Sequence, residues 1–125
     1  MLLKDFYTIN SLEKTGEQHF SAVLNINEKH EIFKGHFPGN PVMPGVCMMQ
    51  IIKELVEEIA TAPLFMQSLS NVKFMALINP EINPELRLEL EVSETEDGLV
   101  KVRNTTYFNE TVALKLASTY KKIGP

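Results

Sequence analysis

The sequence predicts a single α+β domain in which an antiparallel β-sheet curls around one long central helix. Residues 46–60 carry the extended helical pattern of apolar residues that such a central helix needs. One strand-like segment precedes this helix and four follow it. Since 125 residues suit one compact domain, we expect that domain to span residues 1–125.

Before the helix, the chain contains one clear strand pattern and then an irregular loop. In 18–27 apolar residues occupy every second position, the period of a half-buried strand. The prolines and glycines of 38–44 prevent regular structure. In 46–60 apolar residues cover about half of the circumference at about 100° per residue, which predicts a helix largely surrounded by other elements. Pro44 suits its first turn, and 61–63 ends it.

After the helix, the chain continues with four predicted strands separated by turns. The segments are 70–78, 86–92, 99–108 and 111–120. The clearest of them is 86–92, where leucines and a valine alternate with charged residues. A sheet with one helix on one face leaves its edges open, so we expect pairing with a second copy of the chain.

Composition and charge exclude several classes of function. Charged residues make up 22% of the chain, the formal net charge is -4 and no basic stripe is present, so nucleic-acid binding is not expected. The single cysteine, Cys47, excludes an internal disulfide and fits a reducing compartment. Neither a signal peptide nor a membrane-spanning run is recognisable, so we expect a cytoplasmic protein. No residue spacing suggests a metal site, and no cofactor is expected.

The stretch "GHFPGNPVMPGVCMMQ", residues 35–50, carries the candidate chemistry. His36 precedes a rigid turn, and its pKa would suit a general base near neutral pH. Gly45 lies at the helix start, where unpaired N–H groups could stabilise a thioester oxygen that gains negative charge. Met43, Met48 and Met49 could line an acyl pocket, although packing in the core explains them equally well.

The motif "GHFPGNPVMPGV" followed by an apolar helix closely resembles the 3-hydroxyacyl-(acyl carrier protein) dehydratases. The segment "VKFMALINPEINPELRLELEV" is also similar to that family, so the resemblance covers about 18–120. It implies a hotdog fold and a homodimer or an assembly of dimers, with two active sites at the interface between subunits. It also implies a substrate bound as an acyl thioester of acyl carrier protein, in the synthesis of fatty acids or related lipid and aryl polyene precursors.

The resemblance also implies roles for individual residues. The catalytic histidine of the family falls on His36, its backbone donor on Gly45, and the carbonyl that holds the histidine ring on Val42. The second catalytic group, an Asp or Glu on the helix, falls on Gln50. The residues expected to contact substrate are Phe37, Pro38, Gly39, Val42, Met43 and Met49.

Gln50 leaves three interpretations open, because an amide can donate a hydrogen bond but cannot deliver a proton at neutral pH. In the first, the chain is a dehydratase in which Gln50 positions the hydroxyl or a water. A variant of this interpretation has Glu54 supply the acid. The other explanation of Glu54 is that it belongs to a solvated edge with Glu57 and Glu58. In the second, the chain is a non-catalytic acyl-binding or partner subunit of a heteromeric dehydratase. In the third, the pocket hydrolyses thioesters, which the missing acid also disfavours.

Three further groups of residues are of interest. We read Cys47 as a small buried apolar residue, although a thiolate is favoured in a first helical turn. His19 and His30 are expected on the surface. Because acyl carrier protein is acidic, docking would need a local basic patch, for which Lys34, Lys73, Lys121 and Lys122 are the candidates.

Overall fold

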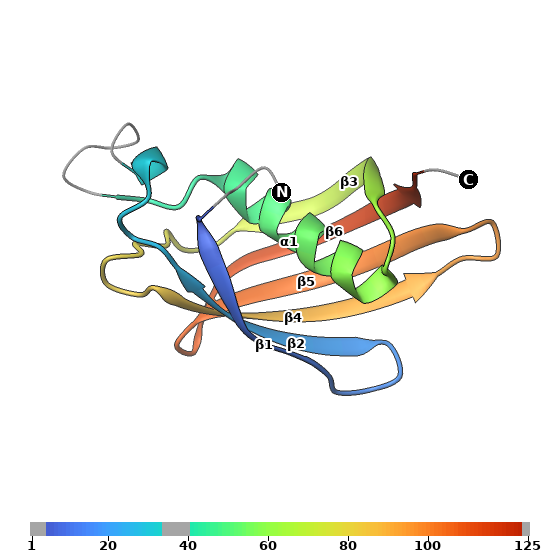
Figure 1. The fold of residues 1–125 in the computed structure, drawn as a ribbon, viewed down its shortest axis with the longest axis horizontal. Coiled ribbons are helices and arrows are strands. Elements are labelled where there is room, and N and C mark those ends of the chain that lie inside the picture. The colour runs from blue at the N-terminus through green and yellow to red at the C-terminus, as the bar shows by residue number, and fades with distance from the viewer. Residues whose placement is uncertain (1–4, 34–40, 124–125) are drawn as a thin grey trace.

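The computed structural model describes residues 5–33 and 41–123. Within these ranges the chain forms six strands, one α-helix and one short 3₁₀ helix (Figure 1). In chain order they are β1 (Tyr7–Lys14), β2 (His19–Ile26), η1 (Glu31–Phe33), α1 (Gly45–Ala60), β3 (Leu64–Phe74), β4 (Glu85–Glu94), β5 (Leu99–Phe108) and β6 (Thr111–Lys122).

The six strands form one sheet in the order β1-β2-β4-β5-β6-β3, and every neighbouring pair is antiparallel. α1 lies along one face of this sheet (Figure 1). The long crossover from β2 through α1 to β3 places β3 beside β6, at the edge opposite to β1. The predicted fold class, an antiparallel sheet wrapped around one central helix, is therefore confirmed.

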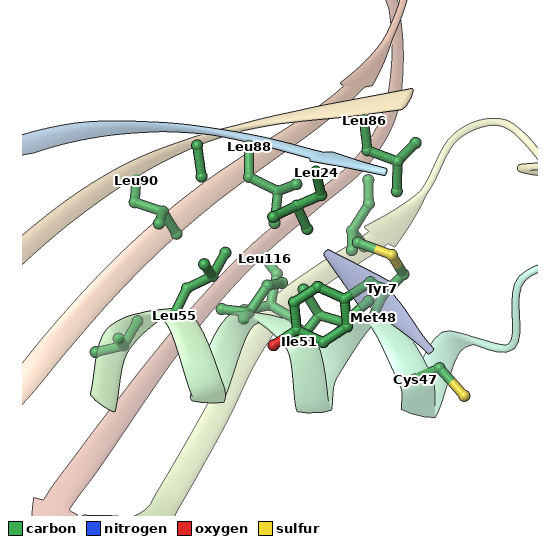
Figure 2. Close-up of a cluster of buried hydrophobic side chains, with 14 of the residues drawn as sticks. Tyr7, Leu24, Cys47, Met48, Ile51, Leu55, Leu86, Leu88, Leu90 and Leu116 are labelled. Carbon is green, nitrogen blue, oxygen red and sulfur yellow. The ribbon is translucent and has the colours of Figure 1, made fainter. Parts of the chain in front are cut away.

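The core lies between α1 and the sheet. Figure 2 shows Leu86, Leu88 and Leu90 of β4 on the face of the sheet that is turned toward α1, and all three are fully buried. From α1 the buried residues are Cys47, Met48, Ile51, Ile52, Leu55 and Val56. Full burial of a leucine or isoleucine stabilises a fold by about 1.5–3 kcal/mol. This face therefore fixes how the helix is rotated, and with it the direction of every other side chain on α1.

Both ends of α1 have identifiable causes. Pro44 precedes the helix in an extended conformation, with φ -65 and ψ 140. Thr61 ends it in the left-handed region, and its N–H donates to the Glu57 carbonyl oxygen. The predicted range 46–60 therefore agrees with the structure to within one residue. In the two described ranges, no helix has the length and apolar character needed to cross a membrane.

Two strands differ from the prediction, and both lie at an edge of the sheet. β1 was not predicted, because only Tyr7 of "YTINSLEK" is buried and no alternation results. The strand predicted at 70–78 runs instead from Leu64 to Phe74. Beyond it, Met75 and Ala76 both donate to the Ala113 carbonyl oxygen, at 2.8 and 3.3 Å, so the regular ladder has ended. An edge strand with one neighbour needs little apolar alternation, which explains both errors.

Candidate functional site

The first turn of α1 presents unpaired backbone donors. The N–H groups of Cys47 and Met48 both donate to the Pro44 carbonyl oxygen, at 3.0 and 3.3 Å. The preceding N–H groups, those of Gly45 and Val46, have no acceptor among the residues that the structure describes. Such groups lie at the positive end of the helix and can bind an oxygen that carries negative charge.

An apolar cavity of about 400 Å³ adjoins this end of the helix. Met43, Gly45 and Met48 line it from the loop and α1, and residues 74–78 with Ala113 and Leu114 line it from the sheet side. The Met43 N–H donates to the Ile78 carbonyl oxygen at 2.8 Å, which fixes the loop against the segment that follows β3. This volume and lining fall within the range of small-molecule sites. The cavity can therefore accept an apolar chain beside Gly45, whose N–H has no acceptor among the described residues.

Gly45 supplies room at the wall of this cavity. A Cβ at position 45 would lie 2.7 Å from Phe74 Cζ and 3.0 Å from its Cε1. Among the described glycines only Gly98 has a positive φ, so backbone conformation does not require glycine at position 45. From the sequence, a thioester oxygen of the ligand was expected to occupy the space beside Gly45 that a side chain would otherwise fill. In the structure the ring of Phe74, which is 58% exposed, lies there.

Replacing Gly45 with alanine separates these two uses of the space. Because the Phe74 ring is exposed and can rotate away, we expect G45A to change the free energy of unfolding by less than about 1 kcal/mol in urea titrations. If a thioester oxygen must approach this N–H, kcat/KM for a 3-hydroxyacyl thioester falls about tenfold or more. Full recovery of activity in the G45A/F74L double variant would contradict this, since it would show that the contact with Phe74 caused the loss.

A second group of polar side chains lies further along α1. The Tyr7 hydroxyl donates to Glu54 Oε1 at 2.6 Å, and Gln50 Nε2 donates to Glu54 Oε2 at 2.8 Å. Tyr7 is 8% exposed, whereas Gln50 and Glu54 are half-buried. Burial, followed by the hydrogen bond to Glu54, raises the pKa of the Tyr7 hydroxyl well above its usual value. The hydroxyl therefore remains a donor at any physiological pH.

Glu54 differs from the two glutamates with which the sequence groups it. Glu58 is exposed, and the Glu57 carboxylate accepts the Leu64 N–H at 2.8 Å near the helix C-terminus. Of these three glutamates, Glu54 alone accepts a hydrogen bond from a distant side chain within the described residues, that of Tyr7, 47 positions earlier in the chain. Sequence reasoning missed Tyr7 because the strand that carries it was not predicted, and no motif marks it.

The two parts of the candidate site lie on different faces of α1. Positions 45 and 50 are separated by about 140° around the axis at about 100° per residue. Accordingly, Gly45 lines the apolar cavity, and Gln50 is not among the lining residues. One chain therefore does not bring the Gly45 N–H and the Gln50 amide into the same described cavity.

The remaining predicted site residues divide into two groups. Outside the described residues lie His36, Phe37, Pro38 and Gly39. Val42 is 9% exposed and Met43 is 7% exposed, so Met43 both packs in the core and lines the cavity. Met48 also does both, whereas Met49 is half-buried against the core and does not line this cavity.

The interpretation of Cys47 as a buried apolar residue is confirmed. Its side chain is 3% exposed, and burial raises the pKa of the thiol rather than lowering it. Among the histidines, His19 is exposed and its Nε2 lies 3.7 Å from Glu91 Oε2. His30, in contrast to the prediction, is half-buried, with its ring edge-on to Phe6. No group of three or more potential metal ligands occurs within the part of the chain that the structure describes.

The candidate docking lysines do not all converge. Lys73 lies opposite Lys115 of β6, whereas Lys121 and Lys122 lie at the far end of the same strand. Lys121 lies six residue steps along the strand from Lys115, a distance of about 20 Å. Lys122 forms an ion pair with Glu94 at 2.7 Å. Lys34 lies outside the described residues.

Comparison with known proteins identifies a related group of enzymes. The family described as ApeI-like, ApeI dehydratase, matches residues 12–114. The 3-hydroxyacyl-(acyl-carrier-protein) dehydratase FabZ of Bacillus pumilus is 30% identical over 122 residues, which cover 91% of this chain and 82% of that protein. The FabZ of Alkaliphilus metalliredigens is 29% identical over 111 residues, covering 83% of this chain and 74% of that protein.

Among solved structures, the dehydratase heterocomplex ApeI:P from Xenorhabdus doucetiae has a similar chain. It superposes with a TM-score of 0.74 at 20% identity, over 92% of this chain and 97% of that chain. At that identity the likeness establishes the hotdog fold alone.

Proposed function

Because the chain belongs to the ApeI-like dehydratase family, we propose that it removes water from 3-hydroxyacyl thioesters of acyl carrier protein to give trans-2-enoyl thioesters. The observation that carries this proposal is the position of the family motif. The loop leads into a helix whose first N–H groups lack acceptors among the described residues and adjoin an apolar cavity of about 400 Å³.

The proposed chemistry begins at the carbon next to the thioester carbonyl. His36 removes a proton from that carbon, and the carbonyl oxygen gains negative charge. The Gly45 N–H, at the positive end of α1, donates a hydrogen bond to this oxygen. The acyl chain beyond the reacting carbons occupies the apolar cavity lined by Met43 and Met48.

Departure of the β-hydroxyl is the step in which this chain differs from the family pattern. Gln50 stands where the resemblance places the acid, and its amide donates to Glu54. In the proposed reaction Gln50 orients the leaving hydroxyl or a bridging water, and the proton taken up by His36 is returned to that hydroxyl. This is a slower arrangement than a dedicated general acid, whose contribution is typically about 10²–10⁴ in rate.

A second chain is part of the proposal. Among the described strands β3 pairs with β6 alone, and it exposes Phe65, Leu69 and Phe74, at 62, 39 and 58%. An exposed apolar edge strand is a surface on which another chain can add. We place a second copy there, so that groups from different faces of two helices can meet at one site.

The alternative function is that of a partner subunit in a heteromeric dehydratase. Both oxygens of the Glu54 carboxylate already accept hydrogen bonds, so Glu54 is arranged as an acceptor rather than as a replacement acid. In this alternative a complete dehydratase chain covers β3 and supplies the missing proton donor. The cytoplasm is the proposed compartment in either case, in keeping with an unpaired, buried Cys47.

Turnover by the isolated chain is the test of this function. Purified protein is incubated with 3-hydroxyacyl and trans-2-enoyl thioesters of short, medium and long chains, on both acyl carrier protein and coenzyme A. Interconversion that shows saturation with substrate supports the proposal. If no thioester of any length reacts, dehydration by the isolated chain is refuted. Acyl-thioester binding without turnover in the same preparation would then favour the partner-subunit alternative.

A further inference from the structure

The hydrogen bonds around Glu54 determine which way the Gln50 amide faces. Gln50 Nε2 donates to Glu54 Oε2 at 2.8 Å, so the nitrogen of the amide faces Glu54 and its carbonyl oxygen faces away. Within the described residues, neither that oxygen nor the second N–H of the amide has a partner. Gln50 thus presents one acceptor and one donor, in a fixed order, at the position that the family pattern gives to the acid.

Tyr7 is the residue that holds this arrangement in place. It belongs to β1, whereas Gln50 and Glu54 belong to α1, so the bond joins the helix to the edge strand. Its ring lies in the buried cluster drawn in Figure 2, which restricts the position of the hydroxyl. Because the donor to Oε1 is anchored, the carboxylate keeps Oε2 directed at Gln50.

We propose that Tyr7 and Glu54 are positioning residues that orient the Gln50 amide toward the leaving hydroxyl of the substrate. This inference rests on the proposed dehydratase function and deepens it. Tyr7 acts through Glu54, and Glu54 acts through Gln50, so neither needs to contact the substrate. If Tyr7 had a structural role alone, its hydrogen bond would only satisfy its own buried hydroxyl, and losing that bond would leave Gln50 unchanged.

The test observes the Gln50 side chain directly. The chain contains three glutamines, and the other two, Gln18 and Gln67, are exposed and serve as internal references. In ¹H–¹⁵N spectra the Gln50 side-chain signals, assigned by their loss in Q50M, should lie apart from the reference signals, because one proton binds a carboxylate. We expect Y7F and E54Q each to move them toward the references.

Tyr107 provides the matched control. It is half-buried, its ring lies 4.1 Å from the Arg87 guanidinium carbon, and its hydroxyl has no hydrogen bond within the described residues. Y107F removes the same atom without touching Glu54, so the Gln50 signals should remain at their wild-type positions. Gln50 signals that stay unchanged in both Y7F and E54Q would overturn the positioning role, whatever the activity of the protein.

Kinetics provide the second readout. We expect Y7F to lower kcat for dehydration roughly three- to tenfold with KM unchanged, because the loss concerns orientation of one hydrogen-bonding group rather than substrate binding. Altered Gln50 signals with wild-type kcat would overturn the catalytic consequence. If the wild-type protein turns over no thioester but the signals respond as expected, the dehydratase function fails and the contact between Tyr7, Glu54 and Gln50 stands.

Discussion

Replacing His36 with alanine is expected to lower kcat/KM for 3-hydroxyacyl thioester dehydration by about 10²–10⁴, the usual loss on removing a general base. In the proposed reaction this side chain both takes the α-proton and returns it to the leaving hydroxyl. With Gln50 unable to deliver a proton, no second acid shares that work. The effect should therefore lie toward the upper end of the range. Steady-state assays of the enoyl product measure it.

His19 offers the control for this substitution. It is an exposed histidine on β2 near Glu91, and it is not part of the motif in the sequence. H19A should therefore leave kcat/KM within about twofold of the wild-type value. Urea titrations of both variants check that the fold is retained. Equal activities of H36A and wild type would remove His36 from the mechanism.

The sequence predicts the interior of this fold better than its edges. The alternation of Leu86, Leu88 and Leu90 and the long apolar pattern of 46–60 follow from burial on one face, and the structure has both elements at those positions. β1 and the first half of β3 lie at the two edges of the sheet. Their residues pack on fewer neighbours, so their composition carries little periodic signal.

The candidate site shows the same division between local and long-range information. Gly45 and the methionines near it are found by motif and spacing along the chain. Glu54, by contrast, is marked in the sequence only by its place four residues after Gln50, which suggests either a replacement acid or part of a solvated edge. Its role depends on Tyr7, which lies 47 positions away and meets it only through the fold. A contact between an edge strand and a helix leaves no pattern in a single sequence.

Exchanging the residues at positions 50 and 54 is expected to raise kcat by as much as about 10²–10⁴ over the wild-type chain, if departure of the hydroxyl limits the rate. The Q50E/E54Q variant places a carboxyl group where the family pattern has its acid and keeps one amide beside it. We expect the contact that joins positions 50 and 54, 2.8 Å long in the natural chain, to form again with donor and acceptor exchanged. Unchanged kcat in this variant would show that proton delivery from position 50 is not what limits the natural chain.

The single variant Q50E should behave differently from the exchange, and the difference is diagnostic. It places two carboxyl groups where Gln50 Nε2 and Glu54 Oε2 are now 2.8 Å apart, and two carboxylates so close must share a proton. Sharing a proton raises the pKa of the carboxyl pair in the folded protein above that of an unfolded glutamate, about 4.3. The stability that the shared proton contributes is therefore fully present below about pH 4.3 and is lost as pH rises through the raised pKa. Urea titrations should therefore show Q50E less stable than wild type at pH 8, with a smaller deficit at pH 5. Q18E, at an exposed glutamine, should show no such pH-dependent deficit. A Q50E deficit that stays equal at both pH values would mean that the two carboxyl groups do not meet, and that the contact between positions 50 and 54 is not the one that positions the amide.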